Sequence, residues 1–161
     1  MESVYIETTI LSYLVANPAK DVVIAGHQLT TQEWWSARRT NFNCFISQVV
    51  VDEISEGDPS EVRKRLAVAG TLDALAVTVD VDKLTESIMK SGVLPPKAVR
   101  DASHIAVATV HNIQYLLTWN CKHLANAQIA KRIAGICKAA GYEMPTICTP
   151  EELLEELTDE E

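Results

Sequence analysis

The sequence VYIETTIL, residues 4–11, joins a strand-like apolar run to the start of a helix and places a carboxylate at the junction. The three leading apolar residues predict a buried strand. Thr8 or Thr9 can then cap a short helix that begins at Ile10. Glu7 therefore stands at the margin of a buried core, where a carboxylate without a partner is costly.

Strand-like and helical segments alternate along the rest of the chain, which is typical of an α/β fold. Strands are expected at residues 3–7, 42–47, 75–79, 114–118 and 146–148, and helices at residues 21–40, 49–56, 58–70, 82–91, 97–111 and 126–140, with a last helix capped by Thr149-Pro150. Short strands that are apolar on both faces suit a parallel sheet covered by helices. We therefore predict a three-layer sandwich around a mainly parallel sheet of about five strands. Residues 1–157 would form one domain, followed by an acidic tail at residues 158–161.

Composition excludes several classes of protein. The chain has 161 residues, 47% hydrophobic and 22% charged, as expected of one soluble globular domain. A net charge of -8 argues against a broad basic surface for nucleic acid, but it does not exclude a nuclease whose acidic site is neutralised by a metal ion. No apolar run has membrane-spanning length, and the N-terminus lacks the features of a signal peptide. The four cysteines form no C-x-x-C pair, so we expect reduced thiols in a cytoplasmic protein without membrane contact.

Two further carboxylates lie at the margins of predicted helices. At about 100° per residue, Glu53 falls at the boundary of the inward face of its helix, whereas Asp52 faces water. Asp101 heads a helix of small residues and shares one face with Ile105 and Ala108, at the entrance of a buried stripe.

These carboxylates are expected to meet Glu7 at one edge of the sheet. Ligands of parallel α/β folds gather outside the carboxyl ends of the strands, where Glu7 and Asn120 are predicted to lie. Three acids at the margin of a core require a positive partner, and a hard cation with oxygen ligands is the simplest one. We therefore predict that Glu7, Glu53 and Asp101 bind Mg²⁺ or Mn²⁺.

The chain resembles the PIN-domain proteins, whose fold is shared by ribonuclease toxins of the VapC type. The resemblance covers most of the chain and rests on VYIETTIL (residues 4–11), VDEI (51–54), RDASHIAVA (100–108) and LLTWNCKHL (116–124). It implies metal-dependent cleavage of RNA, and a toxin role implies an antitoxin partner. The first three family acids fall on Glu7, Glu53 and Asp101. Thr9 matches the hydroxyl that follows the first acid, and Asn120, the fourth predicted catalytic residue, falls where many members carry a fourth acid.

The implied reaction is in-line attack of an activated water on an RNA phosphodiester. Thr9, Thr118 or Asn120 would orient water or phosphate, and His123 would either contact substrate or cap its loop. Two departures from the family pattern keep another function open. The first acid is usually Asp, whereas Glu7 is longer by one methylene, and Asn120 lacks the charge of an acid. The alternative is a catalytically weak or inactive PIN-like module that acts through a protein partner.

The remaining candidates carry weaker signals. His104 follows Asp101 at i+3, so it is either a surface or satisfied core histidine or, less simply, a metal ligand. Trp34-Trp35 cannot both point inward, which favours partial burial or a homodimer contact. His27 and His111 carry no signal. A small α/β phosphatase is a third possibility, but neither a glycine-rich phosphate loop nor a nucleophile loop is present.

Overall fold

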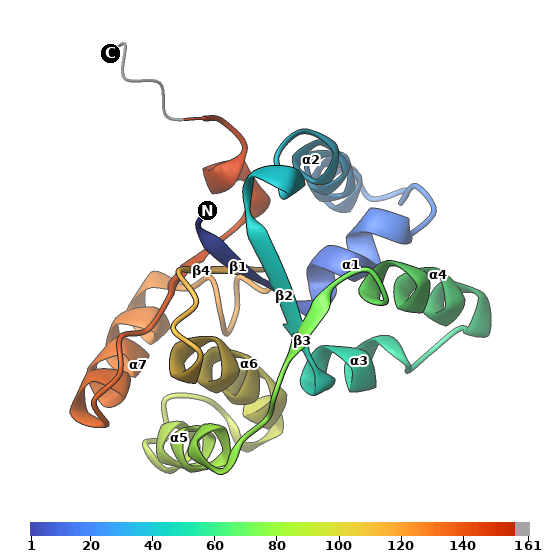
Figure 1. The fold of residues 1–161 in the computed structure, drawn as a ribbon. Helices are drawn as coiled ribbons and strands as arrows, with labels where there is room; N and C mark the ends of the chain where they lie inside the picture. Colours follow the sequence, from blue (N-terminus) through green and yellow to red (C-terminus); the bar gives the residue numbers. More distant parts are fainter. Residues whose placement is uncertain (157–161) are drawn as a thin grey trace.

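Parallel strands run through the middle of the molecule, and helices pack on both of their faces (Figure 1). The structure is a computed structural model and describes residues 1–156. The strands are β1 (Ser3–Ile6), β2 (Asn43–Ser47), β3 (Asp73–Leu75), β4 (Tyr115–Leu117) and β5 (Thr146–Cys148). The α-helices are α1 (Thr8–Val15), α2 (Val22–Ala37), α3 (Gln48–Ile54), α4 (Pro59–Ala69), α5 (Val79–Lys90), α6 (Val99–Val110) and α7 (Ala127–Ala139), and the 3₁₀ helices are η1 (Arg39–Asn41), η2 (Pro96–Ala98) and η3 (Pro150–Leu153). The tail predicted at residues 158–161 lies outside the described residues, and the domain boundary at residue 157 stays a prediction.

The sheet has five strands in the order β3-β2-β1-β4-β5, and every neighbouring pair is parallel. In the register between β1 and β4, Ile6 lies opposite Leu117. Both strands therefore end at the same edge of the sheet, and the residues that follow them, Glu7 and Thr118, emerge side by side. This confirms the predicted parallel sheet.

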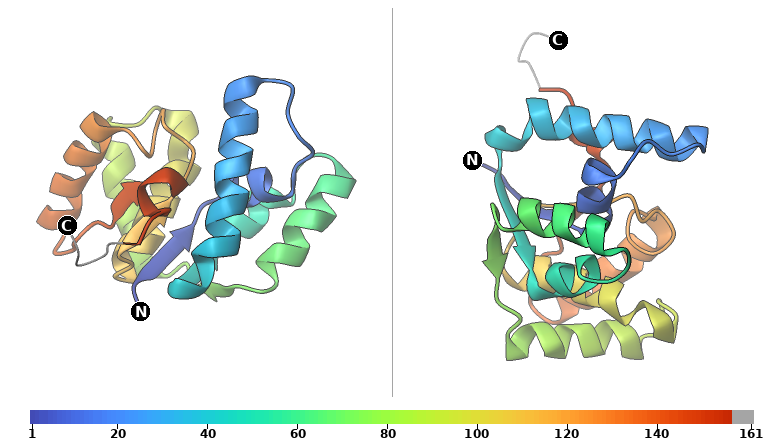
Figure 2. Two further views of the ribbon diagram at one scale, coloured as in Figure 1. Left: turned by 90° about the horizontal axis from the view of Figure 1, so that it is seen from above. Right: turned by 90° about the vertical axis from the view of Figure 1, so that its right-hand side faces the viewer.

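The helices form the two outer layers (Figures 1 and 2). Helices α1, α2 and α4 lie on one side of the sheet, and α5, α6 and α7 lie on the other. The carboxyl ends of β1, β2 and β4 lead directly into segments that carry predicted site residues. The predicted three-layer α/β sandwich is thus confirmed.

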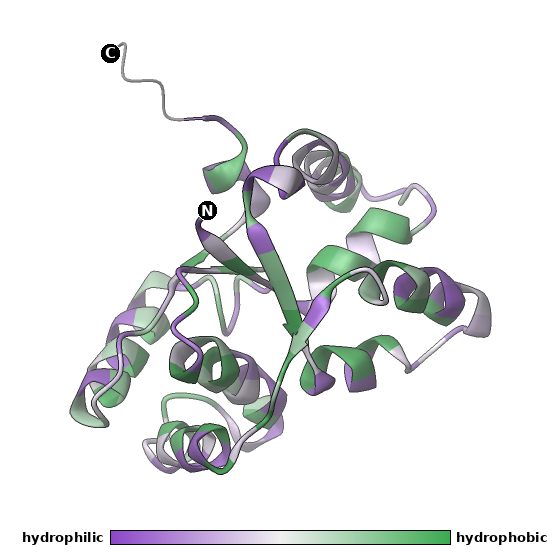
Figure 3. Cartoon of the chain, viewed as in Figure 1, coloured by the Kyte–Doolittle hydropathy of each residue, from purple (hydrophilic) through white to green (hydrophobic). Residues whose placement is uncertain are grey.

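The centre of the core lies where α6 packs beside β1. The apolar side chains of β1 are fully buried, and α6 buries every residue from His104 to Thr109. Alanine at positions 106 and 108 lets this helix lie close to its neighbours, because small side chains bring backbones together. Figure 3 shows hydrophobic residues along the strands, whereas α4, which carries Arg63-Lys64-Arg65, shows hydrophobic and hydrophilic stretches side by side.

Several predicted elements differ from the structure, two of them because a polar side chain caps a helix. Glu7, not Thr8 or Thr9, occupies the N-cap of α1 and accepts the Thr9 backbone N–H. The third strand lies at Asp73–Leu75 rather than at residues 75–79, and the Thr78 hydroxyl caps α5, which begins at Val79. After Thr149 the chain forms the short 3₁₀ helix η3 in place of the expected α-helix.

Among residues 1–156, no helix combines the length and the apolar character needed to cross a membrane.

Candidate functional site

Glu7 lies almost completely buried, with 3% of its surface exposed, at the carboxyl end of β1. Its Oε2 atom accepts hydrogen bonds from the hydroxyls of Thr9 and Thr118, each at 2.6 Å. These hydroxyls accept backbone N–H groups in turn, Thr9 from Trp119 and Thr118 from Asn120, each at 2.9 Å. Both hydroxyl hydrogens are therefore directed at Glu7, which fixes the orientation of its carboxylate.

Glu53 reaches the same region from α3. Its Oε1 atom accepts the Thr8 hydroxyl at 2.9 Å and contacts Nε2 of His104. His104 is fully buried, and its Nδ1 lies 2.7 Å from the hydroxyl of Tyr5, which also bonds the Ser47 hydroxyl at 2.7 Å. His104 is thus a core histidine with both ring nitrogens bonded, and it ties α3 to α6 and β1.

Asp101 forms a second polar group with residues that follow β4. Its Oδ1 accepts the side-chain amide of Asn120 at 3.3 Å, and its Oδ2 lies 3.0 Å from Nδ1 of His123. Oδ1 of Asn120 accepts the backbone N–H of His123 at 3.0 Å, so the side chain of Asn120 both stabilises the loop and holds Asp101.

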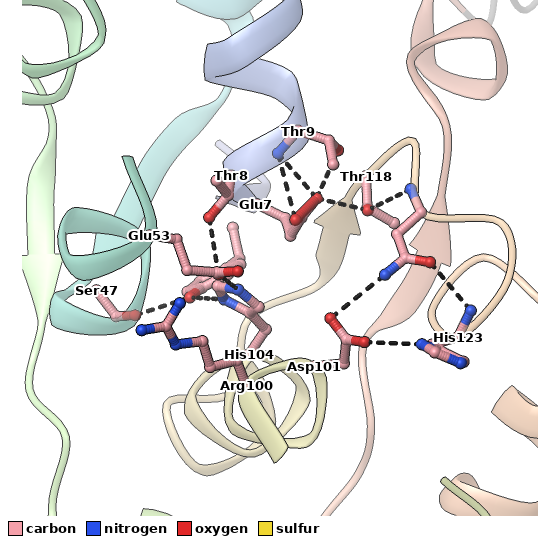
Figure 4. A network of polar contacts seen from close by, with 12 residues as sticks. Glu7, Thr8, Thr9, Ser47, Glu53, Arg100, Asp101, His104, Thr118 and His123 are labelled. Atoms are coloured by element: carbon pink, nitrogen blue, oxygen red, sulfur yellow. Dashed lines mark hydrogen bonds and ion pairs between the residues drawn. The ribbon is translucent and has the colours of Figure 1, made fainter. Parts of the chain in front are cut away.

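The two groups are linked through residues 118–120 (Figure 4). Glu7 bonds the hydroxyl of Thr118, this hydroxyl bonds the backbone of Asn120, and the Asn120 amide reaches Asp101. Ligand atoms of Glu7, Glu53 and His104 lie within 4.8 Å of one another. In the part of the chain that the structure describes, these are the three acidic or histidine side chains close enough together to share one ion. Asp101 lies beside this group rather than in it.

Burial and hydrogen bonding shift the two glutamates in opposite directions. Burial raises the pKa of Glu7, although the charge of His104 and the two threonine hydroxyls oppose this effect. At Glu53 burial also acts upward, but the hydrogen bond and charge of His104, with smaller help from Thr8 and Arg100, leave its pKa lowered. The site therefore holds one carboxylate that resists ionisation and one that favours it.

Two solved structures have a fold similar to that of this chain. VapBC2 from Rickettsia felis, bound to a DNA fragment from its promoter, has a TM-score of 0.59 and 15% sequence identity over 91% of this chain and 97% of that chain. VapC20 from Mycobacterium tuberculosis, a toxin that cleaves the sarcin–ricin loop, has a TM-score of 0.52 and 18% identity over 89% of this chain and 100% of that chain. The chain has the PIN-like fold of these proteins. No protein-family profile and no curated protein matches the sequence, so the likeness is one of fold.

The donor chemistry of this site fits a hard divalent cation. Oε2 of Glu53 accepts no hydrogen bond from residues 1–156, and Oε1 of Glu7 accepts only the long bond from Thr9, at 3.2 Å. Each oxygen of Asp101 accepts one bond and keeps a second lone pair. All three carboxylates thus retain oxygen lone pairs for Mg²⁺ or Mn²⁺. His104 fits less well as a ligand, because both of its nitrogens are already bonded.

Three polar residues of this network carried little or no signal in the sequence. Tyr5 and Thr8 lie within the first strand and helix, where a hydroxyl does not stand out from the apolar pattern. The spacing of His104 from Asp101 places both on one face of α6, but it does not show that the imidazole reaches a carboxylate on α3.

Proposed function

We propose that this protein is a divalent-metal-dependent endoribonuclease that cleaves RNA phosphodiester bonds. The observation that carries the proposal is the close approach of Glu7 and Glu53 to His104 at the carboxyl edge of a parallel sheet, with Asp101 beside this group. A buried carboxylate such as Glu7 is costly without a cation, and this cost is accepted more readily at functional sites than in structural cores.

Glu7 and Glu53 would hold Mg²⁺ or Mn²⁺ through their free oxygen lone pairs, and Asp101, beside them, would offer a further oxygen. When bound, the ion supplies a Lewis acid for the phosphate and a bound water of lowered pKa. Thr9 and Thr118 act through Glu7, because their hydroxyls hold its carboxylate in place. Asn120 and His123 hold Asp101 in the same way, and both are near enough to the site to orient water or phosphate.

Arg100 supplies a positive charge beside the acids. Its guanidinium lies 2.6 Å from Glu56 in an exposed ion pair and lowers the pKa of Glu53 from a distance. An exposed ion pair is weak, so a phosphate can take the place of Glu56 at little cost. Arg100 is therefore the residue that we expect to meet the RNA backbone next to the acids.

The fold also supports a role in a toxin–antitoxin pair. One structure with this fold is a VapBC protein and another is described as a toxin that cleaves the sarcin–ricin loop. We infer that this chain acts on RNA in the cytoplasm as such a toxin, with an antitoxin protein as its partner and with a homodimer as its assembly.

The proposal is tested by incubating the protein with RNA in Mg²⁺ or Mn²⁺. We expect cleavage that a chelator stops and that Asp101→Asn lowers by more than about 100-fold, since loss of outer-sphere partners alone costs about 10–100-fold. Asp73→Asn is the matched control, because Asp73 is exposed on β3. Equal cleavage by the parent protein and Asp101→Asn contradicts the proposal.

A second candidate function is a weak or inactive PIN-like module that acts through a partner. It is favoured by Asn120, which donates to Asp101 where a fourth carboxylate would add charge for a second ion. Metal titration separates the two functions. An enzyme saturated to 100 times its Kd gains about 2.7 kcal/mol of stability, whereas a module that binds no metal shows no rise in melting temperature.

A further inference from the structure

An aromatic stack lies beside the acidic site. The ring of His27 on α2 packs flat on Trp119, with ring centroids 4.0 Å apart and an interplanar angle of 9°. Trp119 is 7% exposed, and its indole N–H donates to the buried Thr31 hydroxyl at 2.7 Å. The surface on which His27 rests is therefore fixed.

Hydrogen bonds join this stack to the acids. The backbone N–H of Trp119 donates to the Thr9 hydroxyl, which itself donates to Glu7. Tyr13 lies one helical turn beyond Thr9 on α1, and its ring centroid is 6.4 Å from that of His27. His27 and Tyr13 thus form an aromatic rim. Trp119, on which His27 stacks, is linked to the carboxylate of Glu7 by two successive hydrogen bonds through the Thr9 hydroxyl.

The polar atoms of the rim are free for a ligand. His104, His111 and His123 each bond another residue through a ring nitrogen. The ring of His27 makes no hydrogen bond with residues 1–156, and neither does the hydroxyl of Tyr13. Both side chains are partly exposed, so a ligand can reach them. Of the four histidines, His27 is the one whose ring, among residues 1–156, is held by aromatic packing without a hydrogen bond.

We propose that His27 and Tyr13 bind an unpaired nucleobase of single-stranded RNA next to the phosphate that is cleaved. Every base has a π-face that stacks on aromatic side chains, and the imidazole and phenol can bond its polar edge. The net charge of -8 strengthens the inference, because a chain without a basic surface needs contacts to RNA other than phosphate attraction. This inference rests on the proposed ribonuclease function and adds the residues that position a base beside the cleaved phosphate.

The test measures binding of a short single-stranded RNA by fluorescence anisotropy, with Asp101→Asn in every protein so that cleavage does not interfere. We expect His27→Ala to weaken binding about tenfold and His27→Phe, which keeps a planar ring, to retain most of the affinity. His111→Ala is the matched control, because His111 lies at the far end of α6 and bonds the Ala76 carbonyl. A strand of the same length without bases should bind both His27 variants and the parent equally.

Each outcome decides the proposal. Equal RNA affinity of His27→Ala and the parent overturns the proposal. An equal loss of affinity of His27→Ala for RNA and for the strand without bases also overturns it, as does the absence of any RNA binding. Loss of affinity for a protein partner alone, with RNA binding unchanged, assigns the rim to a protein contact and also overturns it. Cleavage by the protein without the Asp101 change is scored separately, so a base-binding rim on a protein that cuts no RNA refutes the ribonuclease and leaves the rim standing.

Discussion

At the scale of single residues, the site depends on one carboxylate that is destabilised and one that is stabilised. Glu7 is buried among hydroxyl and backbone groups, whereas Glu53 contacts His104 and keeps one oxygen free of bonds from residues 1–156. Burial raises the pKa of Glu7, and His104 lowers that of Glu53. Their contributions to folding without metal must then have opposite signs.

Neutral substitutions at these two positions should move stability in opposite directions. The pKa of Glu7 in the folded protein lies above its ordinary value of 4.5, so its contribution to stability is lost as pH rises from 4.5 through the folded pKa. Above that window Glu7→Gln should raise the melting temperature in chelator. The contribution of Glu53 is present above 4.5 and is lost as pH falls through its lowered pKa, so Glu53→Gln should lower the melting temperature at neutral pH. About 1 kcal/mol corresponds to about 2–4 °C for a chain of this size, which calorimetry resolves.

The metal reverses the first of these effects. With Mn²⁺ present, the parent protein should gain stability and both variants should gain less, because each lacks one proposed ligand. Shifts of the same sign for the two variants in chelator would falsify the electrostatic account of the pair.

Replacing Asn120 by an acid should destabilise the protein unless metal is present. Its amide donates to Asp101, so Asn120→Asp sets two carboxylate oxygens against each other at the site of a 3.3 Å bond. We expect a lower melting temperature in chelator, by about 2–4 °C per kcal/mol lost, and a larger rise with Mn²⁺ than in the parent. Thermal melts with and without Mn²⁺ check both, and an unchanged metal response excludes a contribution of this position to ion binding.

Sequence pattern located the acids better than it located their partners. Helical spacing separated Glu53 from Asp52, and the structure indeed leaves Asp52 exposed and Glu53 partly buried. The spacing does not reveal that Asp101 bonds Asn120 and His123, because those contacts join α6 to a loop about twenty positions further along, which has no periodicity.

At the scale of elements, the same limit applies to boundaries. Apolar runs sufficed to predict β1, β2, β4 and β5, since each of these strands carries buried or partly buried apolar residues. The run near residue 75 failed, because its apolar residues continue into α5 and only the Thr78 cap marks the change. A cap such as that of Thr78 is a single hydrogen bond from a polar side chain, and the pattern of hydrophobic residues does not predict where it forms.

The elements around the site are joined by one buried hydroxyl. Tyr5 on β1 bonds Ser47 at the end of β2 and His104 on α6, so Tyr5→Phe leaves both partners unsatisfied inside the core. We expect a loss of about 1–3 kcal/mol in the free energy of unfolding, measured by chemical denaturation. Tyr115→Phe is the matched control, because the hydroxyl of Tyr115 bonds Glu2 at the surface. Equal losses for the two variants would show that the buried bonds of Tyr5 add nothing to stability.

At the scale of the whole molecule, the predicted α/β sandwich follows from chain order, because each parallel strand requires a crossover helix and the helices then cover both faces. Chain order does not predict the assembly state in this way. Of the two tryptophans that suggested a homodimer contact, Trp34 is buried, and Trp35 is partly buried beneath the guanidinium of Arg39. Trp34 therefore offers no surface to a second copy, and Arg39 covers one face of Trp35.

The outer face of α2 is the better candidate for the proposed homodimer or antitoxin contact. Val22 and Leu29, seven positions apart on one face, expose 85% and 66% of their surfaces there, and exposed apolar clusters mark interaction sites. We expect Leu29→Arg to shift the mass measured by light scattering from dimer to monomer, since a buried charge without a partner opposes association. Val79→Arg is the matched control, because Val79 is 69% exposed on α5, in the opposite layer of the sandwich. A monomeric parent protein, or a Leu29→Arg dimer of unchanged mass, excludes this face from self-association and leaves the antitoxin as its proposed partner.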